Sequence, residues 1–174
     1  MKKVLFISGS LRTGSLNTSL LQAFAHELPS TIEPVWADLQ LPLFNEELEA
    51  EYPAAATTLR DQIIAADAIV IATPEYNRAM SGALKNAIDW ASRPYGKNAW
   101  AGKTVLVTSV SPGGIGGALA TYQVKQSLLH LDAVVVGQPE FMVGHAGDKF
   151  ADDGTLVDEA TREHVVAALE KLLA

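Results

Sequence analysis

Short apolar runs alternate with stretches of helical spacing along the whole chain. Continuous apolar runs of this length are typical of strands that are covered on both faces. After the first run, Leu20, Leu21, Phe24 and Leu28 recur at the three- and four-residue spacing of an amphipathic helix. The pattern predicts strands at 4–7, 34–37, 68–72, 103–108 and 133–136, and helices at 20–28, 53–66, 81–92, 118–131 and 161–173.

The regular alternation of strand and helix predicts an α/β fold with a doubly wound, five-stranded parallel sheet and helices on both faces. Pro34 opens the second strand, and because proline has no N–H to donate, this strand is expected at an edge. Right-handed crossovers then favour the strand order 2-1-3-4-5, which is the flavodoxin-like arrangement. No repeat or linker divides the chain, so we expect residues 1–174 to form a single domain.

The loop after the first strand is polar and reads GSLRTGSLN at residues 9–17. The helix that follows offers unpaired N–H groups and the positive end of its dipole. Ser8, Ser10, Thr13 and Ser15 add hydroxyl donors, and the guanidinium of Arg12 suits phosphate oxygens. The loop therefore predicts a monophosphate site. The alternative interpretation is a strand-to-helix turn whose Ser and Asn residues only cap the helix.

Two better-known phosphate loops do not match this stretch. Gly9 and Gly14 have the spacing of a P-loop, but Ser15 stands in place of its lysine and Leu16 in place of its hydroxyl residue. The dinucleotide fingerprint is also absent, because Leu11 occupies the position of its second glycine. Nucleotide hydrolysis is therefore the weakest of the functions considered.

Two further loops follow predicted strands and should meet the first loop at the carboxyl edge of the sheet. One carries Tyr76, which offers a flat surface to a planar ring, and Asn77, which can hydrogen-bond to heteroatoms at the edge of that ring. The other runs from Ser111 to Gly117 and has four glycines in five positions, which allow backbone N–H groups to approach a ligand closely. Such donors could stabilise negative charge on a reduced ring. Taken separately, each loop could also be an ordinary turn or a flexible connection.

Composition narrows the choice of function. A net charge of −7 argues against a nucleic-acid surface, and no apolar run has the length needed to cross a bilayer. The chain has no Cys and its four His residues are scattered, so we expect neither a metal site nor thiolate catalysis. The absence of Cys and of a secretory signal favours a cytoplasmic location.

The three loops contain no His, and Glu75 is their only carboxylate, so no general acid–base pair can be assembled from them. We therefore expect no catalytic side chain. A site for one phosphate and one flat ring suits a cofactor that carries its own chemistry, and FMN meets this description.

Several motifs together resemble the NADPH-dependent FMN reductase family, which includes bacterial quinone, azo-dye and chromate reductases. The resemblance covers nearly the whole chain and is carried by residues 9–17, PEYN at 74–77, SGALKNAIDW at 81–90, SRP at 92–94, SPGG at 111–114 and PEFM at 139–142. It implies bound FMN, NADPH or NADH as co-substrate, and a two-electron transfer to a small-molecule acceptor such as a quinone. It also implies a homodimer or homotetramer in which the third helix and the Glu140 region take part.

The loops and the resemblance together give one set of expected cofactor-binding residues. These are Ser10, Leu11, Arg12, Thr13, Gly14, Ser15, Leu16 and Asn17 around the phosphate, Pro74, Glu75, Tyr76, Asn77 and Arg78 at the ring, and Ser111, Gly113 and Gly114 near its pyrimidine edge. Two other functions remain open at this point: a flavodoxin-type electron carrier that serves a protein partner, and a sensor whose flavin reports redox state.

Overall fold

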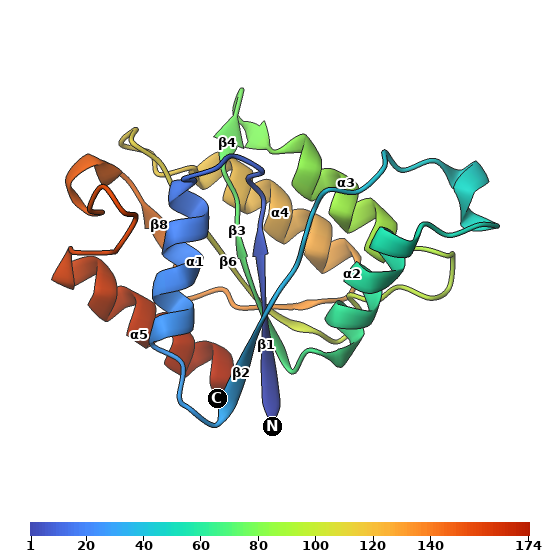
Figure 1. The fold of residues 1–174 in the computed structure, drawn as a ribbon, viewed down its shortest axis with the longest axis horizontal. Coiled ribbons are helices and arrows are strands. Elements are labelled where there is room, and N and C mark those ends of the chain that lie inside the picture. Colours follow the sequence, from blue (N-terminus) through green and yellow to red (C-terminus); the bar gives the residue numbers. More distant parts are fainter.

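The computed structural model describes residues 1–174 and is built on one mostly parallel sheet (Figure 1). The strands lie in the order β2-β1-β3-β6-β7. The short strand β8 also pairs with β6, nearer the carboxyl end of β6 than β7 does. The predicted order 2-1-3-4-5 is confirmed. The strands are β1 (Lys2–Ser8), β2 (Ile32–Trp36), β3 (Ala68–Ala72), β6 (Thr104–Val110), β7 (Val134–Val135) and β8 (Met142–Val143).

Helices cover both faces of this sheet, as predicted. Two of them pack on one face, namely α1 (Leu16–His26) and α5 (Glu159–Leu173). Three pack on the other, namely α2 (Ala54–Ala65), α3 (Gly82–Ala91) and α4 (Ala118–His130). No helix combines the length and the apolar character that crossing a membrane requires.

The central strands supply side chains to two separate cores. Val4 and Phe6 of β1 join the core under α1 and α5, whereas Leu5 and Ile7 join the core under α2, α3 and α4. Every residue of β3 is buried. This two-sided burial explains why these strands read as continuous apolar runs, because successive side chains point to opposite, equally covered faces.

The structure adds two features to the predicted elements. A short antiparallel hairpin, formed by β4 (Glu75–Tyr76) and β5 (Ala79–Met80), rises from the loop after β3. The fifth strand position is also divided, because β7 pairs with the start of β6 and β8 with its end. The predicted strand at 133–136 is therefore only the first half of this edge of the sheet.

The segment from Asp38 to Tyr52 packs along α3 instead of projecting freely. Asn86 of α3 accepts a hydrogen bond from Phe44 N at 2.8 Å and donates to the Pro42 carbonyl at 3.0 Å. The segment also contains a short 3₁₀ helix, η1 (Glu46–Glu49).

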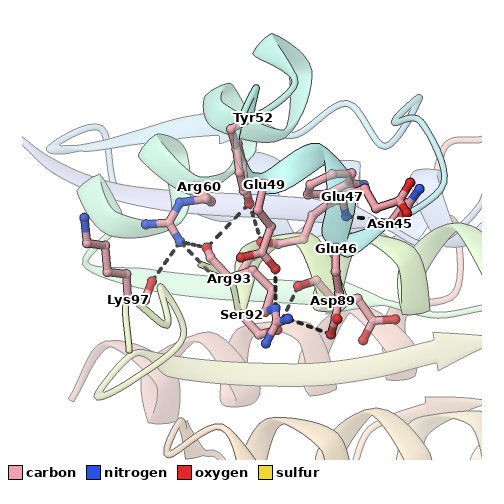
Figure 2. A network of polar contacts seen from close by, with 12 residues as sticks. Asn45, Glu46, Glu47, Glu49, Tyr52, Arg60, Asp89, Ser92, Arg93 and Lys97 are labelled. Carbon is pink, nitrogen blue, oxygen red and sulfur yellow. Dashed lines mark hydrogen bonds and ion pairs between the residues drawn. The ribbon is translucent and has the colours of Figure 1, made fainter. Parts of the chain in front are cut away.

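Figure 2 shows the polar network that holds the end of this segment. Arg93 donates to Glu49 at 2.6 Å and to Glu46 at 2.7 Å, while Tyr52 donates to the Trp90 carbonyl. Arg60 of α2 donates to the carbonyls of Arg93 and Lys97, just beyond the end of α3. The side chain of Glu49 is only 20% exposed as a result of this network.

Candidate functional site

Three loops meet at the carboxyl edge of the sheet. Ser8, at the end of β1, pairs in register with Ala72 of β3, and Ala72 pairs with Thr108 of β6. The loops that follow these strands therefore start side by side. Figure 1 shows them at the same end of the sheet, opposite the end at which β1 begins.

The first two loops are in direct contact at Gly9. Its N–H donates to the Ala72 carbonyl at 2.8 Å, and its carbonyl accepts from the Ser81 hydroxyl at 2.6 Å. A Cβ at this position would lie 3.0 Å from Cδ of Pro74, so the close approach of the two loops requires glycine here. Pro74 is accordingly buried against the first loop.

The first loop leaves hydrogen-bond donors free at the start of α1. Ser15 is the N-cap residue and is 3% exposed, yet its hydroxyl makes no capping bond. The N–H groups of Leu16, Asn17 and Thr18 have no partner within the protein. The alternative that Ser15 merely caps the helix is therefore not what the structure shows. A helix N-terminus with unpaired donors suits an anion.

The remaining residues of this loop lie around that helix end. Arg12 donates through Nη2 to the Gly14 carbonyl at 3.0 Å, and its N–H donates to the Ser10 hydroxyl at 3.4 Å. Leu11, Arg12, Thr13 and Gly14 are all exposed. Gly14 has φ of +66°, a conformation in which a residue with a side chain is strained.

Asn17 has a structural partner. Its side-chain N–H donates to the Val110 carbonyl at 3.2 Å, and its side-chain oxygen accepts from the Val110 N–H at 3.1 Å. Both polar groups of the side chain are thus used to join α1 to the end of β6. The part of Asn17 left for a phosphate is its backbone N–H.

The hairpin of the second loop is fixed to α4. Glu75 accepts hydrogen bonds from the N–H groups of Leu119 and Ala120 at 3.0 and 3.2 Å, so it caps α4 from another part of the chain. Gln123 of α4 accepts from Met80 N at 3.0 Å. The turn of the hairpin consists of Asn77 and Arg78, with φ of 53° and 64°.

The glycine-rich third loop packs against a segment that the sequence did not connect with the site. The N–H of His145 donates to the Gly113 carbonyl at 3.3 Å, and a Cβ on Gly144 would lie 2.5 Å from the Gly114 carbonyl oxygen. A Cβ on Gly114 would in turn lie 2.9 Å from Nε2 of His145. In the sequence, only Gly144, shortly after the PEFM motif, could have indicated that this segment packs closely against the third loop.

A cavity of about 380 Å³ lies between the second and third loops. Its lining contains Glu75, Asn77, Arg78, Ser111, Gly113, Gly114, Ile115, Gly116 and Gly117. Tyr76 is 54% exposed beside it, on the same hairpin. The structure therefore groups six of the eight predicted ring-binding residues around one cavity, all except Pro74 and Tyr76, whereas residues 10–17 lie on the adjoining loop.

These observations fit a phosphorylated flat cofactor. The first loop offers unpaired N–H groups, the unbonded hydroxyl of Ser15 and a cation, which is the donor set that a phosphate needs. The second and third loops offer an exposed aromatic ring and a polar cavity of limited size. The strand order, together with the position of the candidate site at the carboxyl edge of the sheet, defines an open α/β protein of the flavodoxin-like class.

The sequence model of NADPH-dependent FMN reductase matches residues 2–148. The chain belongs to the NADPH-dependent FMN reductase family. It is thus an oxidoreductase that uses FMN and NAD(P)H.

Curated relatives and a solved structure are similar over nearly their whole length. A quinone reductase of Pseudomonas putida is 44% identical over 170 residues, which cover 97% of this chain and 91% of that protein. A 2-hydroxy-1,4-benzoquinone reductase of a Burkholderia species is 38% identical and covers 99% and 94% of the two chains. The flavoenzyme NAD(P)H:(acceptor) oxidoreductase FerB of Paracoccus denitrificans superposes with a TM-score of 0.90, at 38% identity, over 99% and 98% of the two chains.

Proposed function

We propose that the chain, as one FMN-binding domain over residues 1–174, transfers two electrons from NAD(P)H to a quinone-like acceptor. The reaction consumes NAD(P)H, a proton and the quinone and yields NAD(P)⁺ and the hydroquinone. Azo, nitro and metal-oxyanion compounds are further acceptors of the same kind. The single observation that carries the proposal is the convergence of three polar loops at the carboxyl ends of β1, β3 and β6.

Each loop has its own part in binding. Ser10, Arg12, Ser15 and the first N–H groups of α1 hold the phosphate. The hairpin supports the ring through Pro74, Tyr76 and Asn77, and Ser111, Gly113 and Gly114 present backbone groups to its polar edge. The unpaired donors at Ser15 to Thr18 and the cavity beside the hairpin support this assignment.

The protein residues bind and orient but transfer no proton. Glu75 is the only carboxylate in the three loops, and it is bonded to α4 and to Arg78. When bound, FMN would supply the redox chemistry, which is acceptance of hydride from NAD(P)H at N5 and delivery of two electrons to the acceptor. By holding the rings in contact, the loops can contribute roughly 7–11 kcal/mol to lowering the barrier.

The visible spectrum of the purified protein tests this proposal. We expect flavin absorption that bleaches on anaerobic addition of NADPH and returns when a quinone is added. A protein that remains colourless after incubation with FMN would contradict the proposal. Steady-state turnover of the quinone separates an enzyme from an electron carrier or a redox sensor.

We also propose that the protein is a homodimer or homotetramer. Leu119, Tyr122 and Leu129 of α4 are large and exposed, which supports contact with another copy through this helix. Tyr122 donates to Glu140 at 2.8 Å, so the Glu140 region lies beside the same surface. Light scattering during gel filtration gives the mass, and a monomer at micromolar concentration would contradict this proposal.

A further inference from the structure

The hairpin turn contains an arginine where its geometry favours glycine. Both turn residues, Asn77 and Arg78, have positive φ, as in the two-residue turns that prefer Asn-Gly. A non-glycine residue in this conformation is strained, and asparagine tolerates it better than arginine. Strained residues of this kind cluster at functional sites, so a strained residue that lines a cavity is a candidate for a functional role. Arg78 lines the 380 Å³ cavity.

The side chain of Arg78 is held in place at one end only. Its Nη1 lies 3.2 Å from Glu75 Oε1, and Gln123 donates to its backbone carbonyl at 3.4 Å. The side chain is nevertheless 65% exposed, so most of its N–H groups are free to bind a ligand. Glu75 fixes the direction of the guanidinium without covering it.

The charge of Glu75 is partly offset from the other side. Its Oε2 accepts from Leu119 and Ala120 at the N-terminus of α4, where the helix dipole is positive, and its side chain is only 10% exposed. These are the only two charged residues in the lining, and Arg78 is the more exposed of the two, so its cation is the charge that a ligand beside the ring meets first.

The rest of the lining also presents donors. The N–H groups of Gly114, Ile115 and Gly117 have no partner within the protein. Ser111 and Asn77 add polar side chains, and no second carboxylate lines the cavity. These N–H groups lie on the loop that is proposed to face the polar edge of the flavin ring. For a second ligand beside that ring, the attractive charge is therefore the exposed cation of Arg78, which suits a ligand that carries negative charge.

We propose that Arg78 is a specificity-determining residue that favours acceptors with an anionic substituent on or beside the quinone ring. This inference rests on the proposed quinone reduction and concerns the choice among quinones. Arg78 acts by attracting and orienting the anion, so its effect falls on KM and on binding of the acceptor. Because Arg78 also belongs to the residues expected at the flavin ring, each variant is compared as the FMN-saturated protein.

A matched pair of acceptors tests the proposal: 1,4-naphthoquinone and 1,4-naphthoquinone-2-sulfonate. Because the sulfonate also changes the electrophilicity of the ring, the measure is the ratio of the two kcat/KM values compared between protein variants. We expect Arg78→Gln to lower this ratio about tenfold, through the KM of the sulfonate, as the loss of one charge-assisted hydrogen bond implies. Arg78→Lys should restore part of it. Arg162→Gln on α5 removes the same charge far from the cavity and should leave the ratio unchanged.

A binding measurement provides a readout that does not depend on turnover. Naphthalene-2-sulfonate cannot be reduced by this route, and its dissociation constant follows from the change in flavin absorbance of the FMN-loaded protein. We expect the constant to rise about tenfold in Arg78→Gln and to depend less on salt than in the wild type. Arg78→Gly removes the charge and places the preferred residue in the turn. A change that it shares with Arg78→Gln therefore comes from the lost charge and not from a folding defect.

Two outcomes overturn the inference. One is an equal ratio of kcat/KM in the wild type, Arg78→Gln and Arg78→Gly. The other is a dissociation constant for the sulfonate that does not change among them. Either result leaves the proposed function standing as long as both quinones are still reduced. A wild-type protein that binds FMN and reduces neither quinone contradicts the proposed function itself.

Discussion

Asn17 and Val110 are joined by two hydrogen bonds, at 3.2 and 3.1 Å, between the side-chain amide of one and the backbone of the other. The two residues are 93 positions apart in the chain. This pair fixes the N-terminus of α1 against the end of β6. The free N–H groups at the start of α1 and the third loop thereby keep a constant spacing.

We expect Asn17→Ala to destabilise the protein even without FMN. The substitution removes two buried hydrogen bonds and leaves the N–H and C=O of Val110 unpaired, which should cost about 2–3 kcal/mol. Urea denaturation of the FMN-free protein measures this loss. Asn45→Ala is a suitable control because Asn45 makes a single exposed bond, to Glu47 N, and should cost less. Equal stability of Asn17→Ala and the wild type would refute a structural role for this pair.

Arg12→Ala should weaken FMN binding without unfolding the protein. Its side chain makes one hydrogen bond, to Gly14 on an exposed loop, so the fold does not depend on it. Loss of a charge-assisted bond to phosphate should raise the dissociation constant roughly 10- to 100-fold. Titration followed by flavin fluorescence measures this, with Arg162→Ala as the control. An unchanged affinity would count against the phosphate assignment.

Gly144→Ala should displace the third loop through a clash with its backbone at Gly114. Its Cβ would lie 2.5 Å from the backbone oxygen of Gly114, so the loop must shift, at a cost of about 1–3 kcal/mol. We expect lower thermal stability together with weaker FMN binding. Gly147→Ala, whose Cβ meets nothing within 4 Å, is the matched control. If the two variants behaved alike, the packing of Gly144 on the loop would be irrelevant to binding.

The N-cap of α5 should make stability depend on pH in the acid range. Hydrogen bonds from the side chain and backbone of Thr161, followed by that from Lys149, lower the pKa of Asp158. Because the pKa is depressed in the folded state, the stabilisation is present above the unfolded value of about 3.9 and is lost as the pH falls through the folded value.

The comparison of wild type with Asp158→Asn tests this. The wild type should be the more stable protein at pH 7, and the difference in urea midpoint should shrink as the pH falls below about 4. A difference that grows toward acid pH would show that the sign is wrong.

Much of the fold could be predicted because the signals were local. The apolar run at 68–72 became β3 with the same limits, and the predicted helix at 81–92 became α3, at Gly82–Ala91. The hairpin was missed because its strands have two residues each and its turn is Asn-Arg instead of the favoured Asn-Gly. The second half of the fifth strand was missed because β8 is also only two residues long.

The candidate site was predictable as a set of loops but not as a set of contacts. Parallel strands bring their carboxyl ends to one edge, so the meeting of the three loops followed from the strand order. The hydrogen-bond partners of Asn17 and Glu75 could not be predicted from the strand order, because both side chains bond to backbone groups of distant elements. Asn17 bonds to Val110, and Glu75 bonds to Leu119 and Ala120. Residue type indicates that a side chain can bind, whereas the fold decides which backbone group it reaches. His145 was missed for the same reason.

Both edges of the sheet interrupt the backbone ladder. Pro34 lies within β2 at one edge and has no N–H to offer, while at the other edge β7 and β8 are separate two-residue strands. A foreign or misfolded strand extends a sheet by pairing with a continuous row of free N–H and C=O groups. Neither edge provides such a row, so the protein should resist edge-to-edge aggregation even when it is concentrated in the cell.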